Sequence, residues 1–213
     1  MSAIERSMHS EPALISRILG GERHLFHELV RPHERAVYVA VYAVLHRHED
    51  AEEAAQETMI KAMTHLDQLA DPAKFKPWLL QIAVNEARLK RRRDHAALFE
   101  SIENGADRDG DMFMPRDFAD WREIPSETLQ RKEIRLAISA ALGKLPLIYR
   151  EVFVLRDIEQ LSTGECAESL GISQQAVKVR LHRARFRIRE ELAPVFKRGW
   201  FERVISFRGK KPW

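Results

Sequence analysis

The fold is decided by residues 161–192, LSTGECAESLGISQQAVKVRLHRARFRIREEL. Ser162, with a glutamate three residues later, has the pattern of a capping box that begins a helix. Gly171 can adopt a positive φ in a tight turn, and Ser173 can cap a second helix directly after it. A helix, a short turn with glycine and a second helix together predict a helix-turn-helix motif.

The second of these helices has an apolar face and a basic face. Its apolar residues recur at steps of four, three and four, and they are Val177, Leu181, Ala184 and Ile188. At about 100° per residue, this spacing predicts a buried stripe and an exposed opposite face. Glutamine, lysine and arginine suit base edges in a major groove, and valine suits a thymine methyl group. The candidate DNA-contacting residues are Gln174, Gln175, Lys178, Val179, Arg180, His182 and Arg183.

The net charge of +3 is unevenly distributed along the chain. One basic run covers residues 88–93, a second covers 178–189, and the stretch 100–127 between them is acidic. Two basic surfaces joined by an acidic connector suggest polyanion binding at two places. A solvated charged face is the alternative for either run alone. In the second run, arginines beside the exposed face can reach phosphates, which supply affinity but little sequence information.

The cysteine count, the lack of long apolar runs and the lack of catalytic motifs limit the class of protein that this sequence can encode. Cys166 is the only cysteine, which excludes an internal disulfide and fits a reducing compartment. No apolar run approaches the roughly 20 residues that span a bilayer, and the first residues lack the order of a signal peptide. We therefore expect a cytoplasmic protein with no membrane insertion. Phosphate loops, nucleophile elbows and metal-ligand spacings are not found, so we expect no catalytic residue, metal or cofactor.

The chain is expected to be all-α, with two small helical domains joined by an acidic flexible linker. The first domain covers residues 10–94, with a helix over 12–19 and another ending near 93. The linker covers 95–125, where glycines and prolines interrupt any period. The second domain covers 126–192, and an extension of unknown role covers 193–213.

The clearest helix of the first domain is expected to begin at Asp50. Together with Glu53, this residue has a capping-box pattern. The residues expected to form its buried stripe are Ala51, Ala54, Ala55, Met59, Ala62, Met63 and Leu66.

Three segments resemble bacterial RNA polymerase sigma factors of the extracytoplasmic-function type. VKVRLHRAR (177–185), preceded by LGIS, resembles their domain four. DAEEAAQETMIKAM (50–63) resembles the helix that these factors press against the polymerase clamp. FKPWLLQIAVNEARLKRRR (75–93) resembles their helix for melting and reading the minus-ten element. The resemblance covers roughly residues 12–94 and 126–192, in the order that the family has.

The resemblance implies a sigma factor that binds RNA polymerase core and directs promoter-specific transcription initiation. The exposed face of the helix-turn-helix would read the minus-thirty-five element. The residues implied at the minus-ten element are Leu69, Lys74, Asn85, Arg88, Arg91 and Arg92. Those implied at the polymerase are Asp50, Glu53, Gln56, Glu57 and Lys61. The implied partners are the beta-prime clamp and beta flap of the core, promoter DNA and an anti-sigma factor.

Some positions depart from the family pattern, and a rival interpretation stays open. Leu69 stands where an aromatic residue is frequent, Val179 where a serine is frequent, and Gln175-Ala176 where Gly-Thr is frequent. The promoter sequence therefore cannot be transferred from relatives. The rival is a conventional helix-turn-helix regulator, with a sensor domain, that binds duplex operator DNA without polymerase.

Overall fold

The computed structural model describes residues 10–101 and 137–193, and every regular element in these ranges is helical. The first range contains the α-helices α2 (Glu11–Leu19), α3 (Phe26–Val30), α4 (Glu34–Leu45), α5 (His48–Thr64) and α6 (Phe75–Ser101). Short helical turns η1 (Arg23–Leu25), η2 (Arg31–His33), η3 (Leu66–Gln68) and η4 (Pro72–Lys74) connect them. The all-α prediction is confirmed.

The second range holds the helix-turn-helix. Residues 137–143 are helical, and they precede α9 (Leu147–Phe153), η6 (Val154–Ile158), α10 (Thr163–Leu170) and α11 (Gln174–Leu192). All but the first residue of the expected extension at 193–213, and most of the expected linker at 95–125, lie outside the described residues. In the part of the chain that the structure describes, no helix is both long and apolar enough to span a membrane.

Two predicted helix boundaries were wrong. α5 begins at His48, with Arg47 as its extended N-cap residue at φ −124° and ψ 132°. Asp50 therefore lies inside the first turn, where its carboxylate pairs with Arg47 at 3.0 Å and Lys90 at 3.4 Å instead of capping the helix. α6 begins at Phe75 and continues to Ser101, so its last turns occupy residues that were expected to belong to the linker.

The buried stripe of α5 is narrower than predicted. Ala51, Ala54 and Ala62 are buried, but Met63 is 44% exposed. The sequence pattern also missed Thr58, which is fully buried and donates its hydroxyl to the carbonyl oxygen of Ala54 at 2.7 Å. That internal hydrogen bond lets a polar side chain occupy a core position four residues from two buried alanines.

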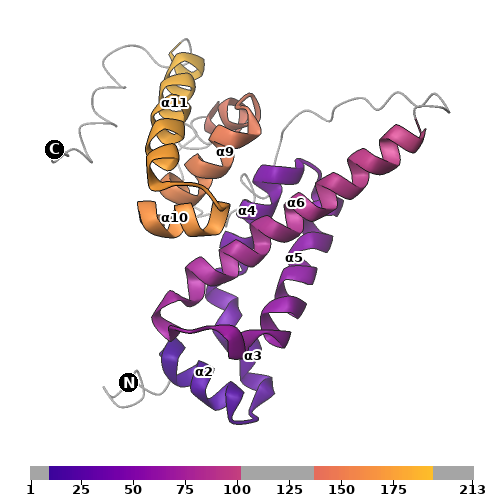
Figure 1. Ribbon diagram of the computed structural model, residues 1–213, viewed down its shortest axis with the longest axis vertical. Coiled ribbons are helices and arrows are strands. Elements are labelled where there is room, and N and C mark those ends of the chain that lie inside the picture. Colours follow the sequence, from indigo (N-terminus) through magenta and orange to yellow (C-terminus); the bar gives the residue numbers. More distant parts are fainter. Residues whose placement is uncertain (1–9, 102–136, 194–213) are drawn as a thin grey trace, which may run out of the picture.

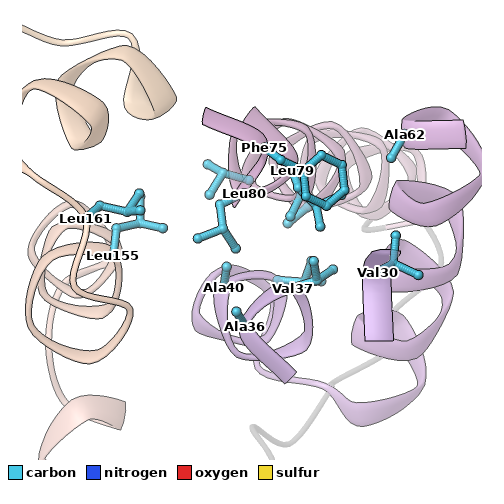
Figure 2. Packing of buried hydrophobic residues seen from close by; sticks show 14 of the residues in the cluster. Val30, Ala36, Val37, Ala40, Ala62, Phe75, Leu79, Leu80, Leu155 and Leu161 are labelled. Atoms are coloured by element: carbon cyan, nitrogen blue, oxygen red, sulfur yellow. The ribbon is translucent and has the colours of Figure 1, made fainter. Parts of the chain in front are cut away.

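The two halves pack against each other around one shared core. α4 lies between α5, α6 and α9, and α10 packs on α6 (Figure 1). Leu155 and Leu161 from the second half face Leu80 and Ala40 from the first (Figure 2). A second cluster lies within the second half, where Leu142 and Leu145 meet Ile188 of α11. The halves are thus not independent bodies in this structure.

Candidate nucleic-acid interface

The helix-turn-helix forms where its local signals predicted. The backbone N–H of Ser162 donates to the Glu165 carboxylate at 2.6 Å, and the N–H of Glu165 donates to the Ser162 hydroxyl at 3.2 Å. Gly171 ends α10 with φ 65°. The N–H of Ala176 then donates to the hydroxyl of Ser173 at 3.1 Å, which caps α11. These bonds satisfy groups that a helix end otherwise leaves unpaired, so they set the angle at which α11 begins.

α11 presents a basic face to solvent. Its predicted apolar stripe is buried, and Val177 and Ala184 have no exposed surface. Arg180 is half-buried, whereas the other candidate residues are exposed, namely Gln174, Gln175, Lys178, Val179, His182 and Arg183. Val179 is 41% exposed, so its methyl groups are accessible to a partner on this face. The arrangement suits a helix that enters a major groove with amide, cationic and methyl groups available.

Two residues outside α11 orient its arginines, and sequence reasoning missed both. Tyr149 on α9 accepts a hydrogen bond from Arg183 at 3.3 Å, and Arg187 lies over its ring at 5.3 Å. The hydrogen bond with Arg183 lowers the pKa of Tyr149. Asp157 on η6 binds Arg185 through two contacts of 2.8 and 2.6 Å. These pairs are 28 to 38 residues apart in the chain, so no local pattern could have predicted them.

A groove on α6 contains four of the residues predicted to contact the minus-ten element, Asn85, Arg88, Arg91 and Arg92. It is lined by Asn85, Glu86, Arg88, Leu89, Arg91 and Arg92. Asn85 and Arg92 are exposed, and Arg91 is half-buried. An exposed amide beside two guanidinium groups can donate and accept along a base edge while phosphates are held nearby.

Arg88 differs from its neighbours because another protein group already holds its guanidinium. Its Nε and Nη2 donate to the two carboxylate oxygens of Glu151 at 2.9 and 2.8 Å, and Nη1 donates to the carbonyl oxygen of Leu170 at 3.1 Å. The bond with Glu151 raises the pKa of Arg88. In this arrangement Arg88 belongs to the contact between the two halves rather than to a free anion site.

The other two minus-ten candidates lie outside this groove. Leu69 is half-buried against the core, and Lys74 is exposed in η4, which Asp71 caps by accepting from the N–H of Ala73 at 3.0 Å. Asn85 comes ten residues after the start of α6, which is about 15 Å along the helix. The predicted minus-ten residues are therefore distributed along α6, the turn η4 before it and the end of η3.

The predicted polymerase face on α5 is partly occupied by internal ion pairs. Glu53 is held by Lys90 at 2.7 Å, which raises the pKa of Lys90, and Lys61 is held by Glu86 at 2.7 Å. Gln56 and Glu57 are exposed. Beside them lie Ile60 at 60% and Met63 at 44% exposure, two apolar side chains that the sequence interpretation did not assign to this face. The open part of α5 is thus a small apolar patch with polar neighbours.

The described residues hold neither a cluster of metal ligands nor an accessible thiol. No three histidine, cysteine or carboxylate side chains of residues 10–101 and 137–193 gather as metal ligands. Cys166 is fully buried, and this burial raises its pKa to about 12, so the thiol stays protonated. A protonated thiol is a poor nucleophile.

Comparison with known proteins agrees with the geometry of both halves. Residues 29–96 match the family model for sigma-70 region 2, and residues 135–188 match that for sigma-70 region 4. The chain is 30% identical over 180 residues to the ECF RNA polymerase sigma factor SigW of Bacillus subtilis, covering 84% of this chain and 94% of the relative. It is 29% identical over 177 residues to the sigma factor CnrH of Cupriavidus metallidurans, covering 82% and 90%.

Solved structures show the same fold. The sigma factor RpoE in complex with the anti-sigma factor NepR from Bartonella quintana superposes with a TM-score of 0.62 at 23% identity, over 78% of this chain and 96% of that chain. CnrH in complex with the cytosolic domain of CnrY superposes with a TM-score of 0.57 at 27% identity, over 85% of this chain and 96% of that chain. A sensor domain before the helix-turn-helix is not favoured, because region 2 occupies that position. The chain belongs to the extracytoplasmic-function sigma factors of the sigma-70 family, which bind RNA polymerase core and direct promoter-specific transcription initiation.

Proposed function

We propose that the two exposed basic surfaces read different promoter elements in different states of the DNA. The face of α11 reads the minus-thirty-five element in duplex DNA, with Lys178, His182 and Arg183 nearest the bases. The groove around Asn85 receives the minus-ten strand once it has opened, and Arg91 and Arg92 follow its phosphates. The single observation that carries this division is the exposure of Asn85 in a groove lined by arginines on α6, on a different element from the reading face of α11.

α5 supplies the contact with the polymerase clamp in this proposal. An interface core needs desolvated apolar side chains surrounded by polar ones. Ile60 and Met63 provide the former, and Gln56 and Glu57 provide the latter. Asp50, Glu53 and Lys61 act mainly by holding α5 on α6, since their charges are paired within the chain.

The protein is proposed to act in the cytoplasm without a cofactor or an enzymatic activity, and to be held by an anti-sigma factor. RpoE of the same fold was solved with the anti-sigma factor NepR, and CnrH was solved with the cytosolic domain of CnrY. Residues 10–94 and 126–192 are proposed as the working domains, since the region 2 and region 4 matches fall within or close to these bounds.

Alanine at Arg183 is expected to act on recognition, and alanine at Asn85 on melting. Loss of a good base contact by Arg183 should cost about 1–3 kcal/mol of discrimination between the promoter and a mismatched site. Asn85→Ala should leave closed-complex affinity unchanged and reduce open-complex formation, because its partner is an unstacked base. Binding of the polymerase–sigma complex to duplex promoter measures the first effect, and permanganate reactivity of the minus-ten thymines measures the second.

Arg189→Ala is the matched control for Arg183→Ala. Arg189 is exposed on the same helix but lies over Phe186 in the last turns, beyond the proposed reading face. The Arg189→Ala variant removes one positive charge, as Arg183→Ala does, but it removes no proposed base contact. We therefore expect it to lower the affinity for promoter and mismatched DNA alike. If Arg183→Ala and Asn85→Ala lowered duplex promoter binding and open-complex formation equally, the two surfaces would not have the separate roles proposed here.

A further inference from the structure

α11 carries arginines on two flanks, one on either side of its exposed reading face. Arg180, Arg183 and Arg187 share one flank, because they follow one another at steps of three and four residues. Arg185 comes two residues after Arg183, so it lies on the opposite flank. Other residues of the second half hold the two flanks, and they do so with chemically different groups.

Tyr149 holds the first flank through groups that carry no charge. Its ring packs against the buried cluster that includes Leu145 and Ile188, and α9 lies beside α11 (Figure 1). Arg183 donates to its hydroxyl at 3.3 Å, and Arg187 lies over its ring at 5.3 Å. A tyrosine hydroxyl is uncharged near neutral pH, because its ordinary pKa is about 10. The two guanidinium groups are thus held in place while their charges stay available to an anion.

Lys144 keeps a nearby carboxylate away from this flank. Glu190 and Glu191 follow Arg187 by three and four residues, the spacing at which side chains meet on a helix. Glu191 is instead bound by Lys144 at 2.6 Å. Within the part of the chain that the structure describes, neither Arg183 nor Arg187 forms an ion pair with a carboxylate. The protein therefore leaves the charge of this flank uncompensated.

Asp157 holds the opposite flank through a carboxylate. Its two oxygens accept from Nε and Nη2 of Arg185 at 2.8 and 2.6 Å, and its side chain is only 22% exposed. A two-bond pair of this kind has the same geometry that an arginine uses to bind a phosphate. A DNA phosphate would have to displace Asp157 before it could bind Arg185. This cation is therefore neutralised within the chain, although it is exposed.

The uncompensated flank is continuous with the residues proposed to lie nearest the bases. Tyr149, His182, Arg183 and Arg187 line one groove between α9 and α11. An arginine side chain loses rotamer freedom when it binds, and ordering it beforehand is worth about two- to twelvefold in affinity. Because Tyr149 orders two arginines beside this groove, it can act on recognition without contacting DNA itself.

We propose that Tyr149 is a positioning residue for minus-thirty-five recognition, holding Arg183 for a base and Arg187 for a phosphate, and that Asp157 withholds Arg185 from the DNA. The side chains around α11 thus select which of its arginines bind the promoter. This inference rests on the proposed function of α11. Base discrimination and salt dependence test its two parts separately.

Tyr149→Phe tests the positioning role, because it removes the hydroxyl and keeps the ring. In the polymerase complex, discrimination between promoter duplex and a mismatched duplex should fall about two- to twelvefold. Adding Tyr149→Phe to Arg183→Ala should cause no further loss, since the hydroxyl acts through that arginine. Tyr38→Phe is the matched control. It removes a hydroxyl that contacts His48 at 2.7 Å on the first half, and it should leave discrimination unchanged.

The salt dependence of duplex binding tests which arginines bind phosphates. The slope of log affinity against log salt changes by about 0.9 for each phosphate neutralised. Arg187→Ala should make the slope shallower by about 0.9, whereas Arg185→Ala should leave it unchanged. Asp157→Asn should steepen it by about 0.9, because it releases Arg185. Glu168→Gln, which removes a negative charge from an exposed position of α10 without releasing an arginine, should leave the slope unchanged.

The possible results separate this inference from the proposed function. Losses from Tyr149→Phe and Arg183→Ala that add in the double variant would overturn the positioning role. A shallower slope in Arg185→Ala, or an unchanged slope in Asp157→Asn with native circular dichroism, would overturn the withholding of Arg185. If Arg183→Ala left discrimination unchanged, the proposed reading role and its positioning by Tyr149 would both fail. The expected slopes would then still support the withholding of Arg185.

Discussion

Replacing Arg150 by alanine is expected to lower the free energy of unfolding by about 3–5 kcal/mol. Arg150 is 6% exposed, and its guanidinium lies at a point where the segment before α9 meets the first half. It donates to the carbonyl oxygens of Leu142, Gly143 and Leu145, and across the interface to that of Ala43 at 3.0 Å. Alanine would remove the guanidinium donor from each of these acceptors. The carbonyl oxygen of Leu142 keeps the backbone N–H of Leu145 at 3.1 Å, whereas each buried group left unsatisfied costs about 1–3 kcal/mol.

Burial also destabilises the charged form of the Arg150 guanidinium. Burial, followed by the nearby charge of Arg91, lowers the pKa of Arg150 to about 10. Arg150 therefore stabilises the fold through its hydrogen bonds, since desolvation of the cation opposes folding.

Urea unfolding followed by circular dichroism measures the change, with Arg150→Lys as the conservative variant. Lysine keeps the charge, but its single ammonium group cannot reach several carbonyls arranged as a fork, so an intermediate loss is expected. Arg189→Ala, an exposed arginine, should change stability by less than about 0.5 kcal/mol. A loss below about 1 kcal/mol for Arg150→Ala would show that water replaces the guanidinium.

Acidification from pH 6.5 to pH 4 is expected to destabilise the protein through His46. This residue follows α4 with φ 60°, and burial, followed by the charges of Arg150 and Arg91, lowers its pKa to about 4. The unfolded chain takes up a proton near pH 6.5, whereas the folded protein resists protonation until about pH 4. The contribution of neutral His46 to the free energy of unfolding is therefore fully present above pH 6.5, and it is lost as the pH falls from 6.5 to about 4.

The size of this pH effect follows from the pKa difference. A drop from 6.5 to about 4 sets an upper bound of about 3–4 kcal/mol at 1.4 kcal/mol per unit. Because His46 is only partly buried, solvent screening reduces the expected loss to about 1–2 kcal/mol.

His46→Asn isolates the contribution of the histidine. Asparagine tolerates the left-handed backbone and does not titrate. Both proteins share all other titratable groups, the remaining histidines included, so the difference between their unfolding free energies at pH 4 and pH 7 reports His46 alone. The variant should lose about 1–2 kcal/mol less than the parent. Parallel pH profiles would exclude His46 as the titrating group.

The helix-turn-helix was predictable because its signals are local. Ser162, Gly171 and Ser173 each act within four residues of their partners, and the apolar stripe of α11 follows the helical repeat. The sequence pattern predicted the wrong start for α5. Asp50 is a residue type that often caps a helix, but the helix begins two residues earlier, and the Asp50 carboxylate pairs with Arg47 and Lys90 instead.

The docking of the two halves depends on contacts between distant residues. Arg88 and Glu151 are 63 residues apart, so no periodicity relates them. One signal was nevertheless present in the stretch RAVYVAVYAVL, which is apolar on all sides. A helix of that kind is covered all round, and Val39 and Ala43 are covered by η6 of the second half.

Transcription in vitro with purified core polymerase tests the assignment of this chain as a sigma factor most directly. A library of genomic fragments is transcribed by core alone, by core with the protein, and by core with the Glu57→Lys variant, which reverses charge on the exposed part of α5. The protein should produce starts at defined positions downstream of one shared pair of elements, core alone should produce none of these starts, and the variant should produce fewer. Specific binding to duplex fragments without core, together with no new start when core is present, would contradict the assignment.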